Sequence, residues 1–359
     1  MSAEGLKLVV HFGESDRAGG RLLADALMDL CGRHGVLASV LMRGVEGFGV
    51  KHRLRTDRLL TLSDDLPLVA VAVDVAERIE RLVPEVAAIV GHGLVTLERV
   101  VVADPRQGGD LGAPGDADVK LVVYCGRSER RDGRTALRAA LATLREAGVP
   151  GATALAGLDG TIARERHRAR FLARNARVPA MVLSVGPPER YAELLPRLGD
   201  ALPGPHVVTV ERVRVVRHDG RVTGEPPAVP ARDARGLAMW QRVSVLAGEW
   251  ERWDGAPLHA QLVRRLREAG AAGATVLRGV AGHSAGRPAH GDRLLAVRRR
   301  TPVLVTFIDT VPEIARLWPL VARATATTGL VTCEVVPAAR AAGPAGVSGG
   351  LALADPRGG

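Results

Sequence analysis

The chain has 359 residues, 47% hydrophobic and 25% charged, which is typical of a folded globular protein, and no apolar run is long enough to span a membrane. The formal net charge is +10, but only 3% of the residues are aromatic, which leaves few platforms for stacking bases, and we expect no nucleic-acid partner. The three cysteines form neither a metal-ligand spacing nor a disulfide framework, and the N-terminus lacks a signal-peptide pattern, so we expect a cytoplasmic protein without a bound metal.

The first hundred residues follow the order β-α-β-β-α-β. An apolar strand over 6–12 is followed by Leu23, Leu27 and Leu30 at helical spacing. The remaining predicted elements are a strand over 39–43, a Val-rich strand over 66–74, a helix over 75–90 and a last strand over 94–102. A polar, glycine-rich loop separates the second and third strands, and Pro84 predicts that the second helix is kinked or split. This order is the ferredoxin-like split β-α-β, which leaves one face of its sheet bare.

The same pattern occurs three times in the chain. The segment Lys7–Gly13 recurs as Lys120–Gly126 and, more loosely, as Arg242–Gly248. The last glycines of these segments are 113 and 122 residues apart, and glycines further along each copy keep the same two separations. Repeats of this size indicate duplicated domains, and three copies can cover one another's bare sheet faces.

We therefore predict an α+β protein of three tandem ferredoxin-like (βαββαβ) domains, which we call repeats 1, 2 and 3. The predicted boundaries are 5–103 for repeat 1, 118–217 for repeat 2 and 237–338 for repeat 3, with linkers at 104–117 and 218–236 and a disordered Gly/Ala-rich tail at 339–359. Basic residues cluster in the long loops of the first two repeats, namely Lys51, Arg53, Arg55 and Arg58 in one and Arg164, Arg166, Arg168 and Arg170 in the other.

Two loops of repeat 1 resemble those of a known family. The stretch Arg43-Gly44-Val45-Glu46-Gly47-Phe48-Gly49-Val50-Lys51-His52 is similar to the loop entry of the nitrogen-regulatory PII proteins, where Gly-Phe-Gly leads into a long mobile loop. Gly91-His92-Gly93-Leu94 lies where those proteins carry a second glycine-rich loop before the last strand. Residues 59–67 (LLTLSDDLP) and 93–96 (GLVT) resemble signature stretches of a PII-like family of small proteins known as domain of unknown function one-ninety.

The resemblance implies an intramolecular pseudo-trimer. PII proteins are homotrimers with their sheets inward, their helices outward and ligand clefts between neighbours, so a chain with three copies is expected to be a monomer. They bind adenine nucleotides in these clefts and move the long loop to regulate another protein. The resemblance therefore implies a non-enzymatic regulator whose effector is ATP, ADP, AMP or cyclic AMP. Its protein partner is unidentified, with a membrane transporter or a fluoride channel as candidates.

The expected ligand-binding residues lie in the two glycine-rich loops of repeat 1. Glycines let backbone N–H groups approach phosphate closely, and nearby Lys or Arg supplies positive charge. The candidate set is Arg43, Gly44, Gly47, Phe48, Gly49, Lys51, Gly91, His92 and Gly93. The alternative is that these glycines only make tight turns.

Repeats 2 and 3 do not keep both glycine pairs. Repeat 2 has Gly160-Thr161-Ile162 and Gly204-Pro205-His206, whereas repeat 3 has Gly282-His283-Ser284 and Thr327-Thr328-Gly329. We therefore predict that the cleft built around the loops of repeat 1 binds ligand; the competing interpretation is that all three clefts have decayed. In repeat 3, Trp250 or Trp253 is a candidate to stack on adenine.

Two alternative functions remain open. One is an interaction scaffold whose clefts have lost their ligands. The other is an enzyme of unknown reaction, although no acid/base or nucleophile constellation recurs between repeats or lies in a convincing context. The segment Gly282-His283-Ser284-Ala285-Gly286 matches the nucleophile-elbow pattern of α/β-hydrolases. We interpret this match as coincidental, because Pro288 follows closely and His290 is too near Ser284 to return as a triad partner.

Overall fold

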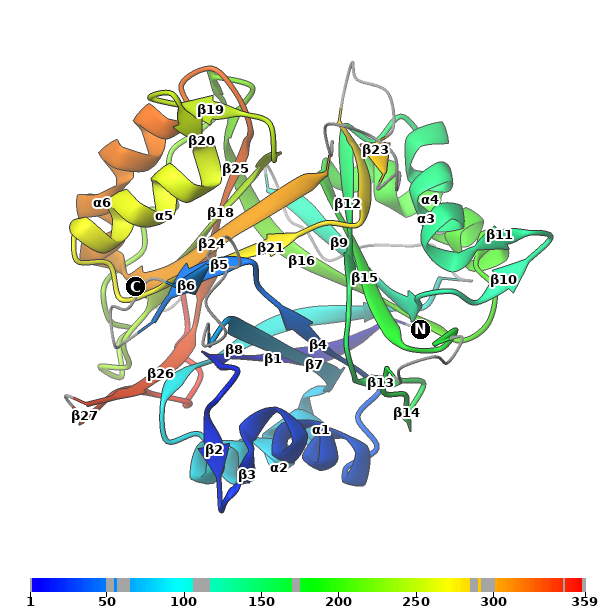
Figure 1. Cartoon of the computed structure of the whole chain (residues 1–359), viewed down its shortest axis with the longest axis horizontal. Coiled ribbons are helices and arrows are strands. Elements are labelled where there is room, and N and C mark those ends of the chain that lie inside the picture. The colour runs from blue at the N-terminus through cyan, green and yellow to red at the C-terminus, as the bar shows by residue number, and fades with distance from the viewer. Residues whose placement is uncertain are drawn as a thin grey trace.

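The computed structural model describes residues 2–49, 55–56, 65–105, 117–169, 175–284, 290–291, 301–344 and 346–356. Three α/β units surround a common centre, each with two helices on the outside and its sheet facing inward (Figure 1). None of the described helices is long and apolar enough to cross a membrane. The predicted fold class is confirmed.

Each repeat contains the six predicted elements in the predicted order. Repeat 1 has β1 (Ala3–Gly13), α1 (Leu23–Arg33), β4 (Ala38–Arg43), β7 (Pro67–Val75), α2 (Ala76–Ile89) and β8 (Gly93–Ala103). Repeat 2 has β9 (Asp118–Gly126), α3 (Ala136–Glu146), β12 (Gly151–Ala156), β15 (Pro179–Gly186), α4 (Pro188–Ala201) and β16 (His206–His218). Repeat 3 has β18 (Trp240–Gly248), α5 (Leu258–Glu268), β21 (Ala274–Arg278), β24 (Pro302–Thr310), α6 (Val311–Ala324) and β25 (Leu330–Val336).

Local sequence explains how these elements pack. Along β1, Leu6, Leu8 and Val10 belong to the core beneath the helices, while the alternate residue Val9 packs on the opposite face of the sheet, as a two-residue period requires. The buried leucines of α1 recur at helical spacing, so one face of this helix packs into the core of repeat 1. The second helix continues through Pro84 to Ile89, so the proline does not split it.

Every sheet has the same antiparallel order. In repeat 1 the order is β4-β7-β1-β8, with Leu8 opposite Ala72 on one side and opposite Leu97 on the other. The order is β12-β15-β9-β16 in repeat 2 and β21-β24-β18-β25 in repeat 3. The two inner strands of each sheet are therefore the first and the third, as a split β-α-β requires.

The last strands of the three repeats join in a closed ring. The end of β8 pairs with β16, with Val102 opposite Thr209, and the end of β16 pairs with β25. The strand that follows β25, β26 (Ala338–Gly343), pairs with β8 and returns the chain to repeat 1. A central core with residues from all three inner sheet faces, including Val71, Leu183 and Leu277, fills the space between them. The chain is thus an intramolecular pseudo-trimer.

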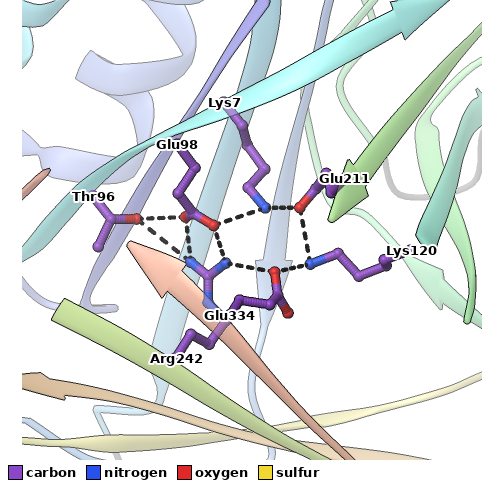
Figure 2. A network of polar contacts seen from close by, with 7 residues as sticks. All are labelled: Lys7, Thr96, Glu98, Lys120, Glu211, Arg242 and Glu334. Atoms are coloured by element: carbon purple, nitrogen blue, oxygen red, sulfur yellow. Dashed lines mark hydrogen bonds and ion pairs between the residues drawn. The ribbon is translucent and has the colours of Figure 1, made fainter. Parts of the chain in front are cut away.

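Six charged side chains form a ring where the three repeats meet. Each repeat contributes one cation from its first strand and, opposite it on the last strand, one glutamate. Figure 2 shows how they alternate, in the order Glu98, Lys7, Glu211, Lys120, Glu334 and Arg242. Every glutamate contacts the cation of its own repeat and the cation of a neighbour, so the ring links all three repeats with balanced charge.

The C-terminal segment does not match the expected disordered tail, and that prediction was wrong. Strand β26 forms a hairpin with β27 (Gly346–Gly350), and it also pairs with the edge of β8. Beyond the hairpin, the backbone N–H of Ala354 donates to the carbonyl of Pro337 at 2.9 Å. The Gly/Ala-rich composition predicts disorder locally, but the unpaired edge of β8, far away in sequence, gives this segment a strand to pair with.

Candidate ligand-binding site

The chain after the second strand of each repeat reaches over the neighbouring repeat. Strand β5 (Glu46–Phe48) pairs with β21 of repeat 3, and β22 (Ala281–Ser284) pairs with β12 of repeat 2. Strand β13 (Thr161–Ile162) pairs with β4 of repeat 1. We call the junction of repeat 1 loops with repeat 3 cleft A, that of repeat 3 loops with repeat 2 cleft B, and that of repeat 2 loops with repeat 1 cleft C.

Cleft A contains a cavity of about 430 Å³. Repeat 1 contributes Phe48, Gly49 and the turn at Gly93, whereas repeat 3 contributes residues of β18 and β24. The C-terminal hairpin adds Ser348 to the lining. This volume lies in the range of roughly 300–1,000 Å³ that small-molecule sites occupy.

The structure brings four of the nine expected site residues together in cleft A, namely Phe48, Gly49, His92 and Gly93. Gly91 is exposed and does not line the cavity. Arg43 points instead to the exposed carboxylate of Glu14, to which it donates at 2.7 Å. Lys51 lies outside the described residues.

Two of the expected glycines are explained by packing. A Cβ on Gly47 would lie 2.5 Å from the carbonyl oxygen of Ala274, and one on Gly44 would lie 3.0 Å from the carbonyl oxygen of Val276, both in repeat 3. These glycines therefore let β5 approach repeat 3 closely, which favours the turn-and-packing alternative at both positions. Gly49 differs, because a Cβ there meets no atom of the described residues within 4 Å.

Cleft A contains polar residues that the sequence analysis did not single out. The Nε2 atom of His11, the Nε1 atom of Trp240 and the Oγ1 atom of Thr306 are buried without a hydrogen-bond partner in the described part of the chain. All three residues line the cavity, together with Asp309. They sit in stretches that otherwise have the pattern of ordinary apolar strands, so only the packing of repeat 1 against repeat 3 reveals them.

Two of the residues that line cleft A, His11 and Asp309, have shifted pKa values. Burial, with a smaller contribution from Arg242, lowers the pKa of His11 to about 3, so the imidazole is neutral at neutral pH. Burial raises the pKa of Asp309, whose carboxylate accepts backbone N–H groups from Ala272 at 3.0 Å and Thr310 at 2.8 Å. The residues that line cleft A therefore include a neutral imidazole, a hydroxyl side chain, an indole and a carboxylate.

Cleft B has a cavity of about 300 Å³ with a different lining. By strand register, Leu246, Leu183 and Gly186 stand where cleft A has His11, Thr306 and Asp309. Trp250 lines cleft B rather than cleft A. Cleft B thus lacks polar groups at these three positions, but Asp118, which stands where cleft A has Trp240, and His283 also line it.

Cleft C is occupied by arginines of the repeat 2 loop. Arg164 donates to Asp74 at 3.0 Å and to the carbonyl of Gly35 at 2.7 Å. Arg166 donates to Asp159 at 2.7 Å and also pairs with Asp29. These basic side chains, which the sequence places in an open loop, instead bind repeat 2 to repeat 1.

The charged ring brings carboxylate oxygens of Glu98, Glu211 and Glu334 within 4.8 Å of one another, a spacing that a metal ion can bridge. However, each carboxylate is already paired with cationic side chains. Burial alone would raise the pKa of Glu98, but Arg242 and Lys7 beside it lower that pKa well below its usual range. The chemistry of this cluster is therefore that of a buried ion-pair network.

Comparison with known proteins agrees with the threefold architecture. Residues 5–102, 118–215 and 240–338 each match the model of the DUF190 family, described as "Uncharacterized ACR", and together they cover most of the chain. A UPF0166 protein of Methanocaldococcus jannaschii is 28% identical over 91 residues, which are 25% of this chain and 83% of that relative. A UPF0166 protein of Aquifex aeolicus is 33% identical over 72 residues, which are 20% of this chain and 69% of that relative.

Both relatives are therefore about the size of one repeat, whereas this chain holds three. The matched segments coincide with the three sheets that meet at the charged ring. The chain belongs to the DUF190 family of PII-like proteins and carries three tandem copies of its domain.

Proposed function

We propose that this protein is a cytoplasmic, non-enzymatic regulator that binds an adenine nucleotide in cleft A and transmits its occupancy to a protein partner. The main support is the cavity of about 430 Å³ between repeats 1 and 3, whose lining combines apolar residues with the polar residues His11, Thr306 and Asp309. In cleft C, the carboxylate at the position of Asp309 is bonded to Arg164 of the repeat 2 loop.

In this proposal, the long loop of repeat 1 communicates ligand binding in cleft A to the protein partner. Phe48 and Gly49 line cleft A, and the basic segment that begins at Lys51 follows them directly in sequence. A ligand that favours one arrangement of Phe48 and Gly49 shifts the balance of conformations in the loop, and a partner can distinguish them. A membrane transporter or a fluoride channel is the candidate partner, and the fused trimer acts as a monomer.

One observation weighs against the hydrolase alternative. In the nucleophile elbow of α/β-hydrolases the serine sits on a sharp turn between a strand and a helix. Here Gly282, His283 and Ser284 lie within β22, which pairs with β12 of the neighbouring repeat. The motif therefore lies in a strand that joins two repeats.

Isothermal titration calorimetry with ATP, ADP, AMP and cyclic AMP tests the proposal directly. We expect saturable heat with at least one of the four nucleotides and no turnover of that nucleotide. Absence of binding with all four would contradict the effector function and leave the scaffold alternative, whereas turnover without a partner would support an enzyme.

A pair of variants in β27 tests the location of the site. Ser348 lines cleft A, and its neighbour Val347 is 61% exposed and does not line the cavity. Because successive residues of a strand point to opposite faces, Ser348→Trp places a large ring toward the cavity and Val347→Trp places the same ring away from it. We expect Ser348→Trp to weaken nucleotide binding at least tenfold and Val347→Trp to leave it unchanged; equal effects would place the site elsewhere.

A further inference from the structure

Cleft A lies at the junction between the first and the last repeat along the sequence. The chain passes from repeat 1 to repeat 2 between Ala103 and Asp118, and from repeat 2 to repeat 3 between His218 and Trp240. Repeats 1 and 3 are not consecutive, so no linker between repeats crosses their junction. The C-terminal segment crosses it instead, from β25 of repeat 3 to the edge of β8 (Figure 1). We call residues 338–344 and 346–355 the C-terminal strap.

The C-terminal strap forms part of the wall of cleft A and packs on both repeats. The strap residues that line the cavity are Ala341, Gly343, Pro344, Gly346 and Ser348. Beside the cavity, Ala339 of the strap belongs to an apolar cluster with Trp240 of repeat 3, and Leu94 of repeat 1 packs against that cluster. The positions equivalent to Trp240 hold Gly5 and Asp118, so the large ring is present only in the repeat that the strap covers.

The hairpin of the strap has few contacts of its own. All five residues of β27 are exposed, and three of them are glycines, which have no side chain to pack. Among the described strands, β27 pairs with β26 alone. A segment with so little buried surface belongs to the least stable part of a fold. The position of the hairpin over cleft A therefore depends on what holds the strap at its two ends.

One end of the strap is held by the pairing of β26 with β8, and the other end is held by side chains. Three side chains, which we call the clasp, bind the backbone of this second end: Arg99, Asp233 and Arg235. The arginines donate to the carbonyls of Ala354 at 3.1 Å and Leu353 at 2.6 Å, respectively, and the aspartate accepts the backbone N–H of Asp355 at 3.0 Å. None of the three clasp residues lines cleft A.

We propose that the clasp and the C-terminal strap form a latch on the junction of repeats 1 and 3, so that docking of the strap and ligand binding in cleft A favour each other. The inference rests on the proposed function and adds the regulation of its site. A ligand that contacts the docked strap binds more tightly while the clasp is closed. By thermodynamic reciprocity, the bound ligand holds the strap in place by the same factor. Release of the strap opens this junction while both repeats stay connected through repeat 2.

Hydrogen exchange of the unliganded protein tests whether the clasp holds the strap. The double variant Arg99→Ala/Arg235→Ala removes two exposed side chains of the clasp and no residue that lines the cavity. Its matched control is Arg212→Ala/Arg221→Ala, two exposed arginines of which Arg212 holds the position of Arg99 in repeat 2. We expect at least fivefold faster exchange in β26 and β27 of the clasp variant, with unchanged exchange in α3. Unchanged exchange of the strap would overturn the latch, and so would equal acceleration in the control.

Titration of the same proteins with ATP, ADP, AMP and cyclic AMP tests the coupling to cleft A. We expect the clasp variant to bind its nucleotide at least fivefold more weakly than the wild type, and the control variant to bind it equally well. In the wild type, the bound nucleotide is expected to slow exchange in β26 and β27. Equal affinities in clasp variant and wild type would overturn the coupling and leave the nucleotide function intact. Absence of binding by the wild type would overturn the nucleotide function and the coupling together.

Discussion

His11 lies between two internal spaces of the molecule. It lines cleft A and also a cavity of about 90 Å³ on the inner sheet faces, where the three repeats meet. At the same register Tyr124 stands in repeat 2 and Leu246 in repeat 3, so repeat 1 alone has an imidazole there. Part of the ring faces the cavities, but its Nε2 atom is enclosed and has no partner in the part of the chain that the structure describes.

The low pKa of His11 makes the stability of the protein depend on pH. The folded-state pKa of about 3 lies below the ordinary value of 6.5, so the unfolded chain binds a proton at this site more readily than the folded chain does. Stability is therefore lost as the pH falls from about 6.5 toward 3, by up to about 1.4 kcal/mol for each pH unit.

Replacement of His11 isolates this contribution. We expect His11→Gln to lose less unfolding free energy than the wild type between pH 6.5 and pH 4.5 in urea titrations. Outside this interval, above pH 7.5, the difference between the two proteins is expected to be constant. Parallel losses of stability below pH 6.5 would show that His11 is protonated in the folded protein.

At the scale of elements, the strands and helices could be predicted from the local sequence pattern, but the contacts between repeats could not. The two-residue period of β1 and the leucine spacing of α1 indicate their own conformations. In contrast, Gly47 looks like a phosphate-binding glycine in sequence, and only the carbonyl of Ala274 in repeat 3 shows that it is needed for packing. The ordered hairpin β26–β27 was missed for the same reason, because its pairing partner β8 is remote in sequence.

Gly160 lies at the corresponding contact between repeats 2 and 1, and its position strongly requires a glycine. Its φ of +150° lies in a region that other residues rarely adopt, and a Cβ there would collide with the carbonyl oxygen of Ser39. We expect Gly160→Ala to lower the unfolding free energy by more than about 2 kcal/mol.

The matched control is Gly49→Ala, where the added Cβ meets no atom within 4 Å in the part of the chain that the structure describes. We expect this variant to have the stability of the wild type or to gain up to about 1 kcal/mol, because alanine restricts the unfolded chain. Chemical denaturation of both variants measures the difference. A tolerated Gly160→Ala substitution would mean that β13 does not pack against β4 as described.

At the scale of the whole molecule, the charged ring is the feature that all three repeats build together. The threefold repeat and the family resemblance predict that the sheets meet, but six charges that alternate between repeats depend on side-chain positions that no single repeat encodes. Repeats 1 and 2 supply Lys7 and Lys120, while repeat 3 supplies Arg242, which bonds to Glu98 through two nitrogens. Breaking a buried ion pair from one side costs about 3–5 kcal/mol, because the partner charge stays buried.

Two substitutions of Arg242 separate charge from packing. Arg242→Met leaves Glu98 and Glu334 without a shared cation, and we expect it to lower the unfolding free energy by about 3–5 kcal/mol. Arg242→Lys keeps the charge and copies the residue of the other two repeats, so its loss is expected to be less than half as large. A methionine variant as stable as the wild type in urea unfolding would show that the ring does not hold the repeats together.

The central claim is that three similar repeats provide one selective ligand site, cleft A. The most direct test is the stoichiometry of adenine-nucleotide binding, measured by isothermal titration calorimetry on the 37.8 kDa chain. We predict a single high-affinity site per chain, because cleft A alone combines His11, Thr306 and Asp309, whereas Arg164 occupies the equivalent carboxylate in cleft C. Three equivalent sites per chain, or none, would contradict the account.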